Sequence, residues 1–215
     1  MFAIGRRKLI LGASALALTG VAACDGASGQ AGANPDDMAL GQADAPVTLI
    51  EYASTTCPHC ADFHRDVYPQ LKANYIDTGR LRLIFREFPT PPPQIAVAGF
   101  QVARCNGATP EQYFARLGVL FDQQRAIFAS GSMEGVRQSL VEIGQGAGLS
   151  EQQVMECIGD QAGADRIRRT VETGQSEFNI TGTPTLILNG RKLEDPAALT
   201  YEGLSRLIDQ AIGEG

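Results

Sequence analysis

Several functional classes are excluded by what the sequence lacks. The chain of 215 residues carries a formal net charge of −6, and it has no basic, aromatic-rich patch of the kind that binds nucleic acid. It shows no internal repeat. It contains only two histidines, and no second pair of ligands stands at zinc spacing from its Cys-x-x-Cys motif. We therefore expect no nucleic-acid partner and no metal, with His64 alone a weak candidate ligand.

The first 23 residues also lack any acidic side chain. Arg6, Arg7 and Lys8 precede an apolar stretch from Leu9 to Ala23, which is too short to span a bilayer comfortably. This pattern is typical of an export signal, so we interpret residues 1–23 as a signal peptide. Without them, 15 basic residues remain against 24 acidic ones, a net charge of −9 that favours solubility. The hydrophobic content of 44% is enough for one sizeable domain.

The signal ends in Val-Ala-Ala followed by Cys24, which resembles a lipobox. We favour lipidation of Cys24, because ordinary cleavage after Ala23 would leave an unpaired thiol in an oxidising compartment. That cleavage remains the alternative. By resemblance to the sorting rule of enteric bacteria, Asp25 would retain a lipoprotein at the inner membrane. The paired arginines resemble a twin-arginine signal, although simple positive charge explains them as well. Residues 24–44 are rich in small and polar residues, and we expect a flexible tether there.

The motif Cys57-Pro58-His59-Cys60 follows an apolar, β-branched run and opens a helical segment. A thiolate at the start of a helix meets the positive end of the helix dipole and unpaired backbone N–H groups, which lower its pKa. Pro58 suits the first helical position, and a protonated His59 would favour the thiolate further. A low pKa makes Cys57 a good leaving group. The motif therefore favours redox chemistry over half of a zinc site or a purely structural disulfide.

The predicted elements run in the order strand, helix, strand, then a block of helices, then two strands and a helix. The first three suit a right-handed parallel crossover, and Asn189-Gly190 suits a hairpin turn. The helical block lacks period-two alternation and is interpreted as an insertion at about 91–165. We expect strands at 47–53, 81–88, 185–188 and 191–193, and helices at 61–75, 94–104, 109–121, 132–144, 150–157, 163–178 and 196–212.

This layout resembles that of the DsbA-like thiol:disulfide oxidoreductases over about residues 38–213. Three motifs carry the resemblance: the Cys-Pro-His-Cys motif, a Glu six residues before its first Cys, and Gly-Thr-Pro-Thr at 182–185. The resemblance implies an α/β, thioredoxin-like fold with an inserted all-helical domain, in which residues 45–213 form the folded unit.

The resemblance also implies a role for each motif residue. Cys57 would be the exposed nucleophile and Cys60 the buried resolving thiol. Thr183-Pro184 would be a cis-proline pair beside the disulfide, whose backbone binds an extended substrate by strand addition. Glu51 would be the buried carboxylate that moves protons to and from Cys60.

The residues by themselves leave alternatives. A Glu within an apolar strand is costly unless it is paired, so Glu51 could instead face an edge, and Pro184 could be an ordinary trans proline at a strand entry. His64 is interpreted as a solvated or packing residue. Thr183 stands where the best-known oxidases carry Val, which leaves the redox potential and the choice of partner open.

Two cysteines, Cys105 and Cys157, fall in the helical insertion. The resemblance implies that they form a second, non-catalytic disulfide, which would stabilise the fold by about 4 kcal/mol in the loop-entropy model. Two separate buried thiols are the alternative.

The function that the resemblance implies is that of an exported oxidase, which donates the Cys57–Cys60 disulfide to folding proteins and is reoxidised by a quinone-linked membrane partner. It would be a periplasmic monomer, tethered to the inner membrane through Cys24 and needing no cofactor. A tethered reductase for cytochrome or copper-centre assembly is the alternative. An isomerase is disfavoured because related isomerases carry an amino-terminal dimerisation domain. A non-enzymatic binding lipoprotein is disfavoured by the intact motifs.

Overall fold

The computed structural model describes residues 1–2, 34–129 and 131–214. Nearly all of the predicted signal peptide, and Cys24, therefore lie outside the described residues. Within the described ranges, no helix combines the length and the hydropathy that a membrane span requires.

A five-stranded sheet forms the centre of the fold, with strand order β1-β3-β2-β4-β5. β2 and β3 are parallel, and the other neighbouring pairs are antiparallel. Apolar residues make up most of β2 and of β3, as expected for strands covered on both faces. The strands are β1 (Met38–Leu40), β2 (Val47–Ala53), β3 (Leu81–Glu87), β4 (Thr185–Leu188) and β5 (Arg191–Lys192).

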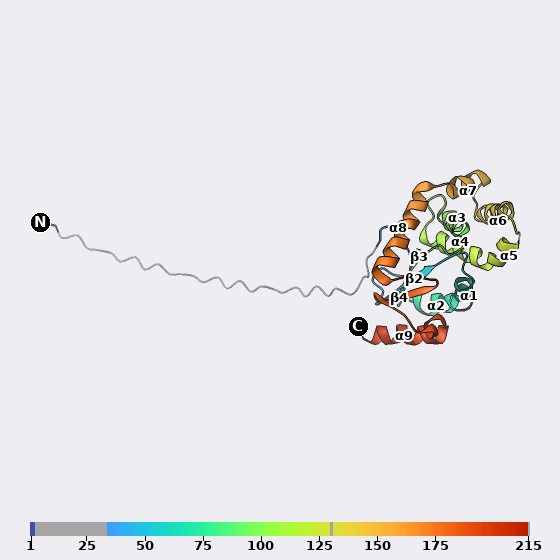
Figure 1. The fold of residues 1–215 in the computed structure, drawn as a ribbon. Coiled ribbons are helices and arrows are strands. Elements are labelled where there is room, and N and C mark those ends of the chain that lie inside the picture. Colours follow the sequence, from blue (N-terminus) through green and yellow to red (C-terminus); the bar gives the residue numbers. More distant parts are fainter. Residues whose placement is uncertain (3–33, 130, 215) are drawn as a thin grey trace.

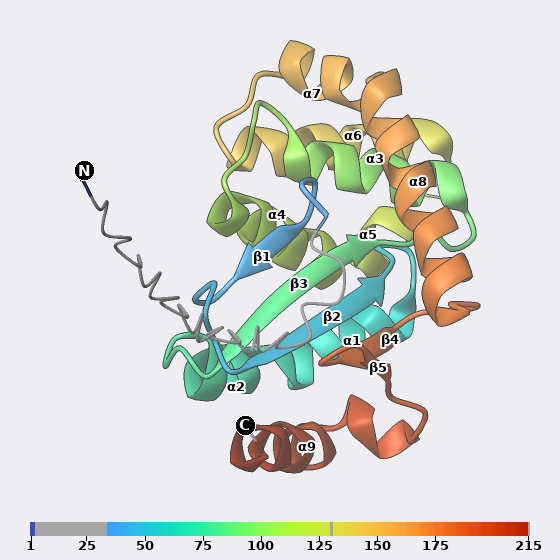
Figure 2. The same ribbon diagram turned by 90° about the vertical axis from the view of Figure 1, so that its left-hand side faces the viewer.

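Helices cover both faces of the sheet (Figures 1 and 2). One face is packed by α8 (Gln161–Phe178), where Ile50 and Tyr52 of β2 meet Phe178. The alternate residues of β2 point to the other face, because side chains alternate along a strand. That face is covered by α1 (Pro58–Asp66), α2 (Tyr68–Leu71) with the π-helical turn Lys72–Ile76, and α9 (Tyr201–Gly213), which follows the 3₁₀ turn Pro196–Leu199.

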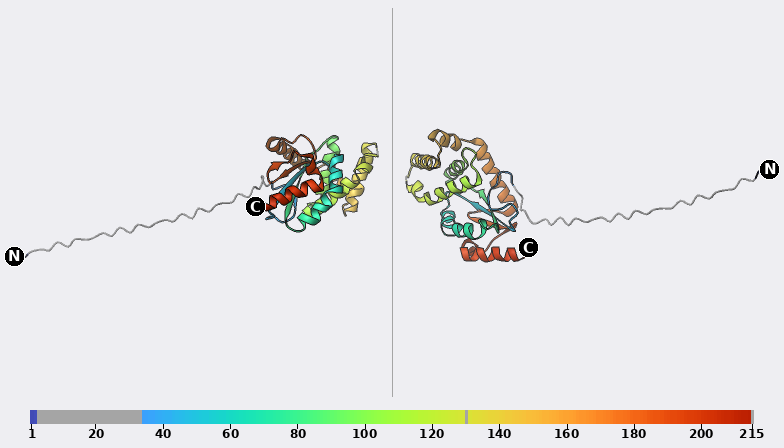
Figure 3. Two further views of the ribbon diagram at one scale, coloured as in Figure 1. Left: turned by 90° about the horizontal axis from the view of Figure 1, so that it is seen from below. Right: turned by 180° about the vertical axis from the view of Figure 1, so that it is seen from behind.

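The remaining helices form a block on the side of the sheet away from α9 (Figures 1 and 3). Two begin with a capping box, at Thr109 and at Ser150, in which the side chain accepts from the third backbone N–H and the Gln there accepts in return. The block comprises α3 (Pro93–Arg104), α4 (Pro110–Asp122), α5 (Gln124–Ala129), α6 (Met133–Gly146) and α7 (Glu151–Ile158), and continues into α8.

A buried carboxylate ties the helical block to the sheet. Glu87, the last residue of β3, is 1% exposed. It accepts hydrogen bonds from Arg104 Nε of α3 at 2.6 Å and from the Tyr113 hydroxyl of α4 at 3.1 Å. Arg166 of α8 adds an ion pair at 3.6 Å. Glu87 thereby joins α3, α4 and α8 to the end of β3.

The predicted fold class is confirmed: the chain has an α/β core with a helical block between β3 and β4. The elements differ in detail. The single helix expected at 61–75 is broken near Val67, where Pro69 supplies no backbone N–H for a continuous helix. α5 was not predicted. The insertion boundary expected near 165 falls inside α8.

The tether expected over residues 24–44 is wrong at its carboxyl end. Met38–Leu40 forms β1, which pairs with β3. The preceding turn is fixed by Asp37, whose two carboxylate oxygens each accept a hydrogen bond from the Arg86 guanidinium at 3.0 Å. Both side chains are almost completely buried. A local reading of composition could not reveal this pair, because its members are far apart in the chain.

Cys105, at the end of α3, is bonded to Cys157 of α7, with the two Cα atoms 5.5 Å apart. We predict that the double change Cys105→Ala/Cys157→Ala lowers the free energy of unfolding by about 4 kcal/mol, because it frees a loop of about 50 residues in the unfolded chain. Guanidinium unfolding curves of the two proteins measure the loss. An unchanged midpoint would contradict the prediction.

Candidate active site at the start of α1

The Cys-Pro-His-Cys motif forms the first turn of α1. Cys57 is the N-cap residue, with extended backbone angles, and Pro58 occupies the first helical position, where its missing N–H costs no helical hydrogen bond. The backbone N–H groups of Cys60 and Ala61 both point back to the Cys57 carbonyl at 3.2 Å. Both motif cysteines are free thiols, Cys57 8% exposed and Cys60 completely buried.

The surroundings of Cys57 favour its thiolate. The hydrogen bond from the Cys60 thiol is the largest cause that lowers the pKa of Cys57, to about 5, against the opposing effect of burial. Thr183 and the backbone N–H groups of Cys60 and His59 lower this pKa further. Hydrogen bonds to the charged form are one of the three ways in which a protein shifts a pKa.

Two groups of Thr183 bear on the Cys57 sulfur: its backbone carbonyl and its hydroxyl. As a thiol, Cys57 Sγ donates to the Thr183 carbonyl at 3.3 Å. The Thr183 hydroxyl Oγ1 is buried and has no hydrogen-bond partner among the described residues. A thiolate at Cys57 would supply the acceptor that this hydroxyl lacks.

Cys60 has the opposite character. Burial raises the pKa of the Cys60 thiol well above its usual range, and the hydrogen bond and the charge of Cys57 and then the charge of Glu51 raise it further. The two sulfurs therefore differ strongly: Cys57 is suited to be an anion and a leaving group, and Cys60 to hold a proton.

His59 is exposed on the outer side of the motif. It acts on Cys57 through its backbone N–H. The expected contribution of its imidazole charge to the thiolate stays a prediction.

The Thr183–Pro184 peptide bond is cis, and its loop lies against Cys57. A pocket of about 370 Å³ beside it is lined by the residues of this loop and by the segment from Lys192 to Leu199. The pocket adjoins the redox site through Thr183, which lines it and whose carbonyl contacts Cys57 Sγ. The substrate-binding roles of Thr183 and Pro184 stay predictions.

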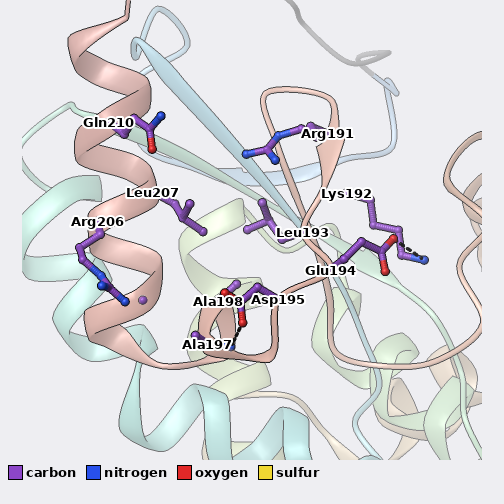
Figure 4. Close-up of a pocket in the computed structure, with 11 residues that line it drawn as sticks. Arg191, Lys192, Leu193, Glu194, Asp195, Ala197, Ala198, Arg206, Leu207 and Gln210 are labelled. Carbon is purple, nitrogen blue, oxygen red and sulfur yellow. Dashed lines mark hydrogen bonds and ion pairs between the residues drawn. The ribbon is translucent and has the colours of Figure 1, made fainter.

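A second pocket, of about 490 Å³, lies between β5 and α9 (Figure 4). Three of its charged side chains have partners close by in the chain. Lys192 Nζ lies 3.5 Å from the Glu194 carboxylate, and the Asp195 carboxylate accepts a hydrogen bond from the Ala197 backbone N–H at 2.9 Å. Unlike the first pocket, it is not lined by Thr183, the residue that contacts Cys57.

Glu51 is completely buried on β2, a central strand of the sheet, which removes the edge-facing alternative. Its two carboxylate oxygens lie 3.1 and 3.0 Å from His64 Nε2 on α1. Of the two interpretations of His64, as a solvated or as a packing residue, the solvated one is wrong, because the residue is 7% exposed, whereas its ring contacts with Tyr68 and Phe121 agree with a packing residue. A signal was present in the sequence: His64 follows Cys60 by four residues, which places both on one helix face, and a Glu in an apolar strand needs a partner.

Gln124 is a second residue that the sequence did not reveal. It lies at the start of α5, and its side-chain amide donates to the backbone carbonyls of Thr55 at 2.8 Å and Cys57 at 3.0 Å. The helical block therefore holds the loop that carries Cys57. No local pattern could have indicated this contact, which joins residues 67 positions apart.

No group of three or more His, Cys, Asp or Glu residues in the described ranges could hold a metal ion.

Comparisons with known proteins show the family and the fold to which the chain is similar. A profile of a family described as thioredoxin matches residues 33–210. A Rickettsia bellii protein whose name marks it as a candidate protein-disulfide oxidoreductase is 30% identical over 83% of this chain and 66% of its own length. Disulfide bond formation protein D of Bacillus subtilis is 22% identical over 80% of this chain and 76% of its own length. The chain spans between 61% and 66% of the length of the rickettsial relatives.

Among solved structures, alpha-DsbA1 of Wolbachia pipientis superposes with a TM-score of 0.72, at 27% identity, over 85% of this chain and 94% of that one. Oxidised BdbD of Bacillus subtilis has a TM-score of 0.68, at 21% identity, over 82% of this chain and 93% of that one, and shows the common fold.

We predict that alkylation of Cys57 in the reduced protein follows a midpoint near pH 5. Because the folded pKa lies below the ordinary thiol value, ionisation stabilises the folded dithiol fully above that ordinary value, and the stabilisation is lost as the pH falls through about 5. Iodoacetamide rates against pH, in a Cys24→Ser background, measure it.

Two variants serve as a matched control. Cys60→Ala removes the largest cause of the shift and should raise the midpoint, whereas Cys60→Ser keeps a donor and should raise it less. A midpoint near the ordinary thiol value in the unaltered dithiol would contradict the account.

Proposed function

The chain belongs to the thioredoxin family, and on that premise we propose that it is a DsbA-like thiol:disulfide oxidoreductase that donates its Cys57–Cys60 disulfide to folding exported proteins. The observation that carries the proposal is the contrast between the sulfurs: the pKa of Cys57 is lowered to about 5, and that of Cys60 is raised. A dithiol stabilised in this way makes its disulfide a strong oxidant.

The reaction runs in two displacements. A substrate thiolate attacks Sγ of Cys57, the Cys57–Cys60 bond breaks, and Cys60 leaves and takes up a proton. A second thiolate of the substrate then attacks the substrate sulfur of the mixed disulfide and expels Cys57 as a thiolate. The substrate gains a disulfide and loses two electrons, which the dithiol keeps. Cys57 is the better leaving group because its thiolate needs no proton.

Substrate would bind along the Thr183–Pro184 loop, whose backbone and adjoining pocket lie beside Cys57. An extended segment added there presents its cysteine to the sulfur and gains main-chain hydrogen bonds that do not depend on sequence. Such binding suits an enzyme that acts on many unfolded chains.

The proposal includes a place and a partner. Export into the periplasm and attachment to the inner membrane through Cys24 would bring the dithiol to a membrane protein that passes its electrons to quinone. The charge pattern of the first 23 residues supports export.

We predict that the oxidised full chain, mixed with an equimolar reduced peptide that carries two cysteines, converts the peptide to its disulfide and is recovered as the dithiol. Mass spectrometry after acid quenching and alkylation measures both products. Cys57→Ser should abolish the transfer, whereas Cys105→Ala/Cys157→Ala should leave it intact.

The opposite equilibrium, in which the reduced chain instead opens the peptide disulfide, would contradict the oxidase proposal. It would favour the alternative of a tethered reductase with a narrow set of clients.

A further inference from the structure

The exchange at Cys57 and Cys60 depends on a proton at Cys60. Reoxidation of the dithiol requires Cys60 to lose its proton before it can attack the mixed disulfide at Cys57. Cys60 is completely buried, so bulk water is a poor acceptor for it. Glu51 is bound by His64, which follows Cys60 by one turn of α1, and its charge raises the pKa of the Cys60 thiol.

Glu51 is itself completely buried, in the middle of the sheet. An isolated buried carboxylate is strongly disfavoured, and in practice such a group becomes neutral. A neutral acid cannot accept a proton from Cys60. The site therefore needs a donor that partners the carboxylate without blocking its approach to the thiol.

His64 is the residue that meets this requirement. Its Nε2 lies 3.0 and 3.1 Å from the two Glu51 oxygens, so that one N–H is shared between them. His64 follows Cys60 by one helical turn, which puts the imidazole and the thiol on the same face of α1. Both therefore approach β2 from the same side.

The imidazole is held rigidly in place. It stacks against Phe121 of α4, with ring centroids 4.3 Å apart, and against Tyr68 of α2 at 5.0 Å. Phe85 of β3 meets it edge-on at 6.0 Å. Of the ionisable groups in the part of the chain that the structure describes, Glu51 on β2 and Tyr68 on α2 contact the ring and Cys60 lies one turn away on its own helix, while β3 and α4 contribute phenylalanines.

We propose that His64 is a positioning residue of the exchange reaction: its Nε2–H partners and orients the Glu51 carboxylate, so that Glu51 can accept the Cys60 proton during attack and return it during reduction. The proton moves from Cys60 Sγ to a Glu51 oxygen as the Cys57–Cys60 bond forms. It moves back as that bond breaks. This inference deepens the proposed function and rests on it only for the redox role of the two cysteines.

A reagent that is released in two steps distinguishes the reaction of Cys57 from that of Cys60. In a Cys24→Ser background, the reduced full chain is mixed with 5,5′-dithiobis(2-nitrobenzoate). Attack by the Cys57 thiolate releases one thionitrobenzoate. Attack by Cys60 on the mixed disulfide then releases a second one and forms the Cys57–Cys60 bond. Stopped-flow absorbance follows both phases, and Cys60→Ala should show only the first.

We predict that His64→Leu slows the second phase by at least about tenfold, because general-base catalysis contributes at least that much, and moves its pH profile to higher pH. The first phase should change by less than about twofold. His64→Gln, whose amide can still donate to Glu51, should restore most of the second-phase rate. In a Glu51→Gln background, His64→Leu should cause no further slowing, because the histidine acts through that carboxylate.

Phe114→Leu is the matched packing control. Phe114 packs on Tyr68 and Phe85, two neighbours of the imidazole, with ring centroids 6.2 Å apart in each case, so the change should lower thermal stability and leave the second phase close to that of the unaltered protein. Equal slowing by Phe114→Leu and His64→Leu would overturn the proposal, as would a second phase unaffected by His64→Leu or not restored by His64→Gln. Absence of any second phase in the unaltered chain would instead defeat the proposed redox function itself.

Discussion

The chemistry of the site depends on stabilising a negative charge on one sulfur, that of Cys57. Cys57 stands at the first turn of a helix, where backbone N–H groups have no helical partners, and it also receives a hydrogen bond from Cys60. Thr183 approaches from the far end of the chain and adds a further contact. The second sulfur, that of Cys60, has the opposite environment: burial raises its pKa and keeps the thiol protonated.

The rest of the fold holds these groups in register. β2 and β4 are neighbours in the sheet, so the ends of the chain segments that carry Cys57 and Thr183 meet. The helical block contributes to the site, because the Gln124 side chain donates hydrogen bonds to the backbone carbonyls of Thr55 and Cys57 at the start of the motif. The block is itself anchored on Glu87 at the end of β3. A substitution within the helical block can therefore shift the backbone around Cys57 and alter the surroundings of its sulfur.

Sequence reasoning reached the features that follow from local pattern. The order of strands and helices, the starts of α4 and α7 and the strand pair after residue 184 all depend on signals within a few residues, and the fold class followed from the resemblance of that layout to a known family. It failed where the partner is distant. β1 depends on Asp37 and Arg86, 49 positions apart. Gln124 serves backbone groups in another element, and the interpretation of His64 as a solvated or packing residue missed its partner, Glu51, which lies across the helix–sheet interface. Long-range pairs of this kind leave no periodic trace.

The reduction potential of Cys57–Cys60 tests the central claim most directly, because it measures how far the fold stabilises the dithiol over the disulfide. The full chain would be equilibrated in glutathione buffers of graded ratio, and the fraction oxidised determined after acid quenching and alkylation. A potential near about −120 mV, as in DsbA itself, is the result that the account predicts. A potential at or below about −250 mV, in the range of thioredoxin, would contradict it.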